Sequence, residues 1–368
     1  MKILVTGRNG FLARNLLLRL NADDRFAVDT WSAADGISKL RKSIKSNEII
    51  VHLASAIRSE IPNLINEQNE WLIDQIRDEL AKSKEEKKLI FSSTAKLDNT
   101  EYGLSKKYAE KKFTNLGKVS KVSCVSVRLP SIFGKFSRPN HNSVVATFCY
   151  NAVNGRELVV HNAAPKLKLI YVDDVVEILL GLIKNPIESS IHEVAPIYSI
   201  NLSDLKQKLI TYSKLSKSDP LPHLGNEFEK RLFSTFKWFQ GIDKPKICQT
   251  HVDKRGLFAE LIKFEGSGQL SYFTIEEGKQ RGGHFHNTKR ERFFVLEGRV
   301  KFIFDEIRSG KRYEVECAAQ DGSLASIDTI PGVVHAIENL GEGQAKLVVW
   351  ANEVFDLKNP DTYMVEIK

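Results

Sequence analysis

The sequence predicts an α/β domain built on a doubly wound parallel sheet, followed by an all-β domain. The chain has 368 residues, more than the roughly 100–200 residues of one typical domain. Its first half alternates short β-branched runs with amphipathic stretches, a pattern typical of βαβ units around a parallel sheet. After about residue 254 the pattern changes to closely spaced strand-like runs separated by glycines, which is typical of a sandwich or barrel.

The expected elements can be given in chain order. In the first half we expect a helix at 11–20 and strands at 3–5, 49–53, 89–91 and 122–127. A stretch with helical periodicity at 202–237 precedes Gly241-Ile242-Asp243-Lys244-Pro245, which we interpret as a hinge. In the second half we expect strands at 270–275, 292–296, 300–304, 312–317 and 345–350. The predicted domains are therefore residues 1–245 and residues 246–368.

Composition excludes several classes of protein. With 42% hydrophobic and 27% charged residues, the chain is close to the globular average. Its most hydrophobic run, residues 175–183, contains Glu177 and is much shorter than the roughly 20 residues that span a bilayer. The amino-terminal residues lack the pattern of a secretion signal, and the four cysteines show no metal or redox spacing. We expect a cytoplasmic protein with reduced cysteines and no membrane partner.

The net charge of +8 does not by itself indicate nucleic acid binding. The excess is spread over short Lys and Arg groups, and no nucleic-acid-binding motif accompanies it. A diffuse positive field also suits a small polyanion such as a nucleotide diphosphate. We expect a small-molecule partner of that kind and no nucleic acid.

A glycine-rich turn joins the first strand to the first helix, in the sequence Thr6-Gly7-Arg8-Asn9-Gly10-Phe11-Leu12-Ala13. Backbone amides at a helix start can face a pyrophosphate, and glycine permits its close approach. The alternative is a plain structural turn. The candidate nucleotide-binding residues are Gly7, Arg8, Asn9, Gly10, Phe11 and Leu12.

A second group of residues suggests proton transfer. Tyr102 and Lys106 are spaced i, i+4, so on a helix they lie on one face. A positive charge there would lower the pKa of the phenol, so that Tyr102 could exchange a proton with a substrate oxygen. Ser93 and Thr94, at the end of a predicted strand, could hydrogen-bond the same oxygen. The alternatives are a solvated helix face and a strand-end turn.

Together these segments resemble the extended short-chain dehydrogenase/reductases, which have a Rossmann-type fold. The resemblance covers roughly residues 1–245 and includes residues 51–54 and Tyr171-Val172-Asp173-Asp174. It implies Tyr102 as proton donor or acceptor, Lys106 as its activator and ribose anchor, and Thr94 as hydroxyl partner, with Ser93 as the alternative. It also implies cofactor contacts at Leu53, Ala54, Tyr102 and Lys106, and sugar-nucleotide contacts at Arg128, Asn142 and Ser143.

Two residues bear on the choice of nicotinamide cofactor. An acid at the end of the second strand would hydrogen-bond a ribose 2′-hydroxyl and repel a 2′-phosphate, and Asp29 is our candidate for that position. This favours NADH. In contrast, Arg8 could face a 2′-phosphate. We expect NADPH, which reductases of the type described below use, with NADH as the alternative.

The second half contains a pattern typical of a metal site. Gly278, His284, His286, Glu291 and Gly298 follow one another closely. On a strand the two histidines share one face, and a turn can return Glu291 beside them. His335 is a candidate fourth ligand. Three histidines and a carboxylate suit a divalent metal, with Zn²⁺ preferred, whereas the alternative is a satisfied polar pair.

These spacings resemble the two cupin motifs over roughly residues 248–368, and residues 253–258 are similar to a strand opening found in sugar-nucleotide epimerases of that fold. The first motif matches fully. In the second, Ile330-Pro331-Gly332 stands where the family has Pro-x-Gly, with His335 still in register. The resemblance therefore implies an all-β cupin barrel.

A reductase domain joined to a cupin resembles the CapF-type bifunctional enzymes of capsule and O-antigen synthesis, also at residues 142–150 and 361–363. The resemblance implies a UDP-amino-sugar substrate and a pathway to UDP-N-acetyl-L-fucosamine. The cupin would epimerise C3 of a UDP-2-acetamido-2,6-dideoxy-4-hexulose, with Lys289, Tyr272 and Glu276 as acid/base candidates. The reductase would then reduce the C4 ketone to the 6-deoxy-talose sugar. Cupins often pair, so we expect a homodimer.

Three alternatives remain open at this point. The chain could be a 4-ketoreductase whose metal-bound cupin is only structural. It could be an epimerase or dehydratase that retains its NAD. It could also be a sugar-nucleotide-binding or assembly protein without catalytic activity, although the intact Tyr102, Lys106, His284, His286 and Glu291 argue against this.

Overall fold

In the computed structural model the chain divides into two compact units. The first comprises Met1–Ser213 and Asn226–Gly241, and the second Lys214–Gly225 and Ile242–Lys368. Asp243 and Lys244 of the predicted hinge lie outside the described residues. The structure describes residues 1–57, 59–61, 63–160, 166–215, 220–242, 245, 247–306, 309–319 and 323–365.

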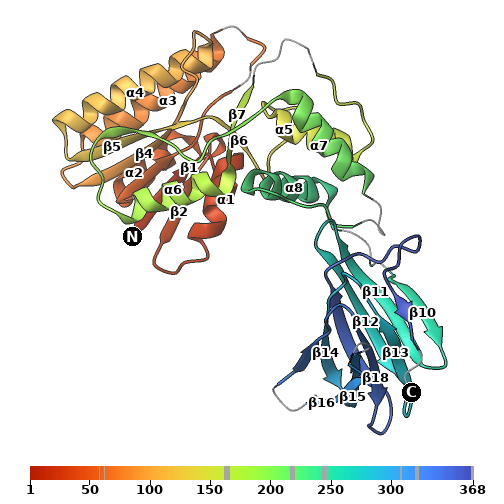
Figure 1. Cartoon of the computed structure of the whole chain (residues 1–368). Helices are drawn as coiled ribbons and strands as arrows, with labels where there is room; N and C mark the ends of the chain where they lie inside the picture. The colour runs from red at the N-terminus through yellow and green to blue at the C-terminus, as the bar shows by residue number, and fades with distance from the viewer. Residues whose placement is uncertain are drawn as a thin grey trace. The chain divides into compact units, whose positions relative to one another are not determined.

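A six-stranded parallel sheet in the order β2-β1-β3-β4-β5-β8 forms the centre of the first unit (Figure 1). Its central strands are buried on both faces, so they consist of continuous apolar runs rather than alternating ones. The strands are β1 (Lys2–Thr6), β2 (Ala27–Trp31), β3 (Ile49–His52), β4 (Lys87–Thr94), β5 (Val122–Leu129) and β8 (Ser190–Glu193).

Helices cover both faces of this sheet. Ile3 and Val5 point to a core shared with α1 (Phe11–Leu20) and α6 (Val172–Lys184). Leu4 points to the opposite core, because side chains alternate along a strand. That second core is formed with α2 (Gly36–Ser46), α3 (Leu64–Ala81) and α4 (Glu101–Val119), and the short 3₁₀ helix η1 (Ala33–Asp35) precedes α2.

The first unit also contains a small sheet of β6 (Ser131–Phe133), β7 (Leu167–Tyr171) and β9 (Tyr198–Ile200) and the helix α5 (Val144–Val153). The helical stretch predicted at 202–237 is two helices, α7 (Leu202–Lys214) and α8 (Glu227–Gln240). Pro220, Pro222 and Gly225 lie between them and do not favour a continuous helix. Asn226 then caps α8, because its side chain accepts a hydrogen bond from the Glu229 amide.

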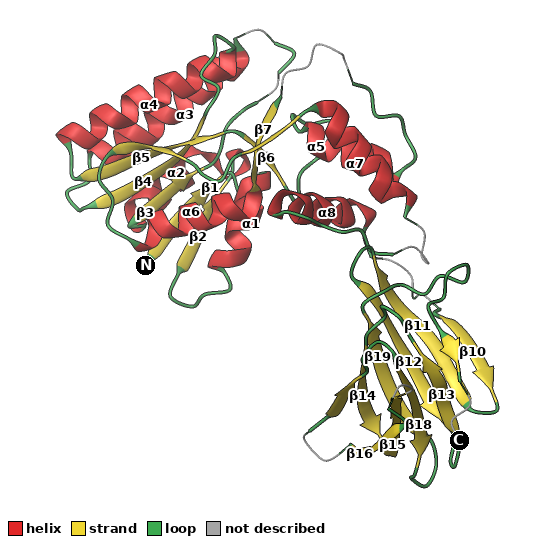
Figure 2. Cartoon of the chain, in the orientation of Figure 1, coloured by secondary structure: helices red, strands yellow, loops and turns green. Residues whose placement is uncertain are grey.

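The second unit consists of two antiparallel sheets (Figure 2), one in the order β10-β11-β12-β19-β14-β17 and the other β16-β15-β18-β13-β20. Phe273, Phe293 and Phe302 belong to a buried core to which strands of both sheets contribute. The first sheet contains β10 (Gln249–Asp253), β11 (Gly256–Phe264), β12 (Gly268–Ile275), β14 (Glu291–Glu297), β17 (Ala325–Asp328) and β19 (Ala345–Ala351). The second contains β13 (Gln280–Phe285), β15 (Arg299–Glu306), β16 (Lys311–Ala318), β18 (Val333–Asn339) and β20 (Tyr363–Met364).

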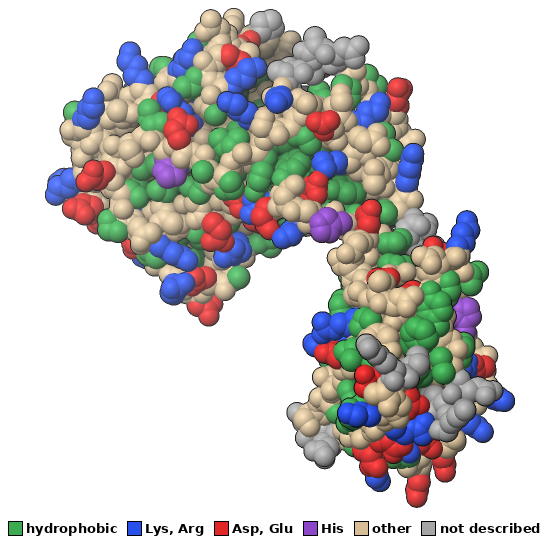
Figure 3. All heavy atoms as spheres, viewed as in Figure 1, with side chains coloured by type: hydrophobic (Ala, Val, Ile, Leu, Met, Phe, Trp, Pro, Cys, Tyr) green, Lys and Arg blue, Asp and Glu red, His purple; other side chains and the backbone are tan. Residues whose placement is uncertain are grey.

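The predicted fold class, a doubly wound parallel sheet followed by an all-β domain, is confirmed. Each strand expected from the sequence overlaps an observed strand. No helix among the described residues combines the length and apolar character that a membrane crossing requires. On the face shown in Figure 3, Lys and Arg side chains are scattered among Asp and Glu side chains.

Candidate active site and metal centre

The glycine-rich turn packs directly on the loop that follows β3. Gly7 has φ +76°, and a Cβ at this position would lie 2.9 Å from Cα and N of Ala54. The Gly7 amide donates a hydrogen bond to the Trp31 carbonyl at 2.7 Å, which joins the turn to the end of β2. No side chain among the described residues caps α1 at Gly10, so the start of that helix suits a phosphate group.

A buried Thr6–His52 pair shapes the same loop. The Thr6 hydroxyl accepts hydrogen bonds from the amides of Leu53 and Ala54, both at 3.2 Å, and lies 2.7 Å from Nδ1 of His52. A hydroxyl has one proton, so Thr6 donates it to His52, whose proton is then on Nε2. Burial, and secondarily the charge of Lys106, lowers the pKa of His52 to about 3. His52 is therefore a neutral structural residue that holds Leu53 and Ala54 against the turn.

Tyr102 and Lys106 lie on α4, as their spacing predicts. Thr100 caps this helix by accepting from the Gly103 amide. The Lys106 ammonium donates to the Ser92 carbonyl at 2.8 Å and lies 5.2 Å from the centroid of the Tyr102 ring. This bond fixes the ammonium beside the phenol ring.

Burial shifts the two pKa values in opposite directions. It raises the pKa of Tyr102 to about 12 and lowers that of Lys106 to about 7. The expectation that Lys106 lowers the pKa of the phenol is therefore wrong, because the loss of hydration disfavours both charged forms. Tyr102 keeps its proton at neutral pH, which is the state that a proton donor needs.

The two candidate hydroxyls of β4 have different surroundings. Ser93 is buried and donates to Glu110 at 2.6 Å. Glu110 also binds the Arg128 guanidinium at 2.8 Å, and Arg128 pairs with Glu193 at 3.2 Å. Thr94 lies on the other face of the strand, since side chains alternate. Ser93 and Arg128 are therefore both engaged with Glu110, whereas the choice of Thr94 as the hydroxyl partner stays a prediction.

Asp29 is not at the end of β2. It pairs with Leu4 in the middle of the strand, and β2 continues to Trp31. The acid beside the glycine-rich turn is instead Asp35, which forms an ion pair with Arg8 and accepts from the Ser32 amide at 2.8 Å. The sequence signal for this residue was the capping-box spacing of Ser32 and Asp35 at the start of the next helical segment.

The other predicted substrate contacts lie near the same loops. Ser143 caps α5 by accepting from the Ala146 amide at 3.2 Å. The Asn142 amide group lies 3.4 Å from the Ile57 carbonyl, in the segment that follows β3. Ser143 therefore has a structural role at the start of α5.

Asn69 is a site residue that our sequence reasoning missed. Its side chain donates to the Ala56 carbonyl at 3.0 Å and to the Ser105 hydroxyl at 3.2 Å, and it accepts from the Ala56 amide at 2.8 Å. It thus links the loop after β3 to the helix that carries Tyr102 and Lys106. Only its helical spacing from the buried Ile73 and Ile76 could have indicated that it points inward.

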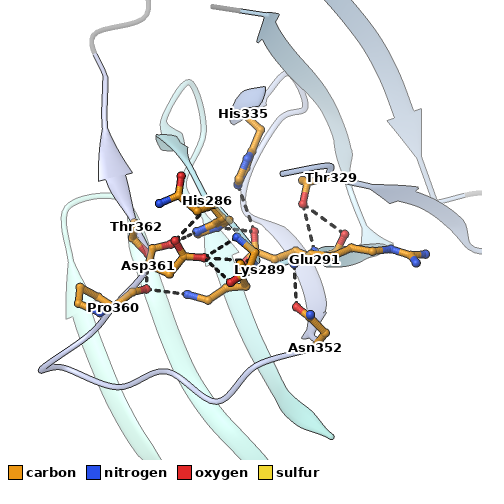
Figure 4. Close-up of polar contacts among 12 residues, drawn as sticks. His286, Lys289, Glu291, Thr329, His335, Asn352, Pro360, Asp361 and Thr362 are labelled. Atoms are coloured by element: carbon orange, nitrogen blue, oxygen red, sulfur yellow. Dashed lines mark hydrogen bonds and ion pairs between the residues drawn. The ribbon is translucent and has the colours of Figure 1, made fainter. Parts of the chain in front are cut away.

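The predicted metal ligands come together in the second unit. His284 lies on β13 directly opposite His335 on β18, His286 follows β13, and Glu291 begins β14. One ligand atom from each lies within 4.8 Å of the others. Nε2 of His286 and of His335 are 3.3 and 3.1 Å from Oε2 of Glu291, and Figure 4 shows these side chains pointing toward one another.

The chemistry of this cluster fits a divalent metal. Among the described residues, Nε2 of His286, Nε2 of His335 and Oε2 of Glu291 are buried without a hydrogen-bond partner, which is costly unless another group binds them. Burial, with the charge of His335, lowers the pKa of His284 to about 4, so its imidazole is neutral. Burial alone would raise the pKa of Glu291, but His286 and His335 bring it below its usual range. Imidazole nitrogens and a carboxylate oxygen are suitable ligands for Zn²⁺.

The three acid/base candidates differ in their surroundings. Lys289 is buried, and its ammonium donates to the Pro360 carbonyl at 2.9 Å. Glu276 accepts from the Gln344 side chain at 2.7 Å. Tyr272 lies next to Phe273 on β12, so it points away from the core that Phe273 enters. Of the three, only Lys289 is a buried charge.

A parallel sheet with a glycine-rich turn at its first strand and a partly buried tyrosine beside a buried lysine defines a nicotinamide-nucleotide-binding protein of the short-chain dehydrogenase type. Residues 3–197 match the NAD dependent epimerase/dehydratase family, and residues 251–363 match the polysaccharide biosynthesis C-terminal domain. The chain belongs to the NAD dependent epimerase/dehydratase family.

Similar proteins agree with this assignment over the whole chain. A UDP-2-acetamido-2,6-beta-L-arabino-hexul-4-ose reductase of Pseudomonas aeruginosa is 36% identical over 372 residues, covering 100% of this chain and 99% of the relative. The capsular polysaccharide assembling protein CapF of Staphylococcus aureus has a TM-score of 0.85 at 29% identity, with 100% of both chains covered. UDP-glucose 4-epimerase of Thermotoga maritima covers 65% of this chain at 18% identity and TM-score 0.55, a likeness of fold alone.

Proposed function

We propose that the protein is a bifunctional sugar-nucleotide enzyme of capsule or O-antigen synthesis. The second unit epimerises C3 of a UDP-2-acetamido-2,6-dideoxy-4-hexulose, and the first unit reduces the C4 ketone with NADPH to UDP-2-acetamido-2,6-dideoxy-L-talose. The main support is that one chain contains both the Tyr102–Lys106 pair and the histidine cluster. The same chain aligns along its whole length with a protein whose name is that of a sugar-nucleotide reductase.

For the reduction, Tyr102 is the proton donor to the C4 oxygen. Its pKa of about 12 keeps the phenol protonated until charge develops on the oxygen of the substrate. Lys106 has donors left after its bond to Ser92, and these can hold a ribose hydroxyl and orient the phenol. The nicotinamide, when bound, supplies the hydride.

For the epimerisation, the C3 proton is removable because it lies α to the C4 ketone. A divalent metal would be held by His284, His286, Glu291 and His335. When bound, it would act as a Lewis acid and stabilise the negative charge that develops on a substrate oxygen. The segment from His284 to Glu291, which joins β13 in one sheet to β14 in the other, carries three of these residues and is well anchored. The Glu291 amide donates to the Thr329 hydroxyl at 3.1 Å, and the Arg290 amide donates to Asn352 at 2.7 Å (Figure 4).

The proposal of NADPH draws on the surroundings of Arg8. The mid-strand position of Asp29 excludes it as the acid at the end of β2, and Asp35, the acid beside the turn, has its charge paired with Arg8. Arg8 lies in the turn that follows β1, and its guanidinium neutralises Asp35. A cofactor 2′-phosphate bound at the end of β2 would compete with the Asp35 carboxylate for this guanidinium.

A second candidate function has specific support. The Pseudomonas aeruginosa relative is named as a reductase alone, without an epimerase activity. The alternative is therefore a 4-ketoreductase whose second unit, with its metal cluster, is structural.

One experiment distinguishes the two candidates. The purified protein would be incubated in D₂O with the 4-hexulose substrate and either NADPH or NADH, and nicotinamide absorbance would be read with the NMR spectrum of the product. We expect NADPH oxidation with deuterium at C3. Oxidation without deuterium would support the second candidate, and no oxidation with either nucleotide would contradict both.

Two variants serve as controls for this experiment. Tyr102→Phe should lower NADPH oxidation by roughly 10²-fold or more while deuterium still enters C3 of the substrate, because the phenol proton is needed only at C4. Glu291→Gln should lower deuterium incorporation. If Tyr102→Phe also abolished deuterium incorporation, the assignment of the two steps to two sites would be wrong.

A further inference from the structure

The C-terminal segment binds the loop that connects two of the candidate metal ligands. This loop, Asn287 to Arg290, lies between His286 and Glu291. The Asp361 carboxylate accepts from the amides of Asn287 at 2.9 Å, Thr288 at 3.0 Å and Lys289 at 3.0 Å (Figure 4). The Thr288 hydroxyl donates to the same carboxylate at 3.2 Å. One side chain thus satisfies three successive backbone donors of the loop.

The main chain of Asp361 contacts a metal ligand directly. Its carbonyl oxygen lies 2.5 Å from Nδ1 of His286. A carbonyl only accepts hydrogen bonds, so Nδ1 of a neutral His286 must carry the proton. The lone pair of the imidazole is then on Nε2, the atom that faces Glu291 and is buried without a hydrogen-bond partner among the described residues.

Neighbouring contacts hold Asp361 in place. The buried Lys289 ammonium donates to the Pro360 carbonyl at 2.9 Å. On the other side, β20 pairs with β13, with Met364 opposite His284. Asp361 itself has φ +41°, a conformation in which Asp and Asn are favoured over most residues.

We propose that Asp361 is a positioning residue of the metal centre. Its carboxylate fixes the loop between His286 and Glu291, and its carbonyl fixes the His286 tautomer that presents Nε2 to the metal. Metal-binding histidines commonly need such a partner on their other ring nitrogen. This inference rests on the metal centre of the proposed function, and the experiment below separates the two.

The first test measures Zn²⁺ affinity of the full chain by competition with a chromophoric chelator. Asp361→Ala removes the acceptors for the loop and is unfavourable at positive φ, so we expect a roughly 10–100-fold loss of affinity. Asp361→Asn tolerates the backbone conformation but replaces one acceptor oxygen by an amide, so its loss should be smaller. The matched control is Asp356→Asn, in the same segment, where the exposed carboxylate accepts from the Lys358 amide. It should bind Zn²⁺ as the unchanged protein does.

The second test reads the His286 tautomer first in the unchanged protein and then in Asp361→Ala. Long-range ¹⁵N–¹H spectra of the chelator-treated, histidine-labelled protein, assigned with a His286→Gln variant, should show His286 protonated on Nδ1. Asp361→Ala keeps the carbonyl but loses the carboxylate contacts that place it, so this protein should show a mixture of tautomers. A cooperative calorimetric unfolding transition of the second unit serves as the folding control.

The outcomes separate the two proposals. Unchanged Zn²⁺ affinity in folded Asp361→Ala, or a His286 protonated on Nε2 in the unchanged protein, would overturn the role of Asp361 alone. Failure of the unchanged protein to bind Zn²⁺ would overturn the metal centre and this inference together.

Discussion

At the scale of single residues, burial rather than charge pairing controls the acid/base state of the reductase site. Lys106 is the clearest case, because it is almost fully buried and burial lowers its pKa to about 7. Tyr102, on the same helix face, has its pKa raised to about 12 for the same reason. Around neutral pH the pair therefore holds a protonated phenol beside an amine that is only partly charged.

Lys106→Met should lower activity and change how stability depends on pH. In the unfolded chain Lys106 titrates near 10.5, so between pH 7 and 10.5 the unfolded state binds a proton that the folded state lacks. Lys106 therefore contributes a rise in the free energy of unfolding with pH in this window, of about 2 kcal/mol between pH 7.5 and 9.5. The variant lacks this contribution.

Urea denaturation followed by circular dichroism at 222 nm checks this prediction. Apart from Lys214 at the end of α7, the helices in the described part of the chain lie in the first unit, so the helical signal reports on that unit. We expect the free energy of unfolding of the unchanged protein to increase relative to that of Lys106→Met as pH rises. Parallel pH dependences would show that Lys106 is charged in the folded state across the whole window.

At the scale of elements, the junctions after β1 and β3 determine whether the nucleotide site forms. The glycine-rich turn and the loop at Leu53 and Ala54 touch through their backbones, and Thr6 and His52 hold them together. Asn69 then connects that loop to α4 through Ser105. The site is therefore built from contacts between loops that different strands deliver to one edge of the sheet.

Gly7→Ala should weaken NADPH binding much more than Gly155→Ala. Both glycines have positive φ, +76° and +65°, so both substitutions should cost roughly 1 kcal/mol of backbone strain. Only at Gly7 does the added Cβ meet backbone atoms, 2.9 Å away in Ala54, whereas nothing lies within 4 Å at Gly155. A fluorescence titration should show at least a roughly tenfold loss of NADPH affinity, about 1.4 kcal/mol, for Gly7→Ala alone. Equal affinities for the two variants would contradict a close approach at Gly7.

At the scale of the whole molecule, the two units have separate cores and separate ligand chemistry. The parallel sheet carries the nucleotide site, and the antiparallel sheets carry the histidine cluster. A ligand that binds only the folded form of one unit should stabilise that unit selectively. The homodimer expected from the sequence stays a prediction.

Metal removal should therefore lower the unfolding temperature of the second unit only. A site saturated about 1,000-fold above its Kd contributes about 4 kcal/mol, which a chelator would remove. Calorimetry of the full chain, with and without dipicolinate, measures this, and the transition of the first unit is identified by its upward shift with NADPH. A chelator that moved neither transition, or both equally, would contradict a metal centre confined to the second unit.

The sequence by itself determined the fold class and the four residues of the histidine cluster, whereas it missed Asn69 and misplaced Asp29. Strand alternation, helical spacing and the turn at Gly7 depend on a few neighbouring residues. The same is true of the two-residue spacing that puts His284 and His286 on one face. The tertiary structure decided which partners these residues meet. Ser93 donates a hydrogen bond to Glu110, and Arg8 forms an ion pair with Asp35. The Asp361 carbonyl contacts His286, which is 75 positions away in the sequence. Partner identity and burial depend on segments that are distant in the chain, and burial is what raised the pKa of Tyr102 where local charge alone predicted a decrease.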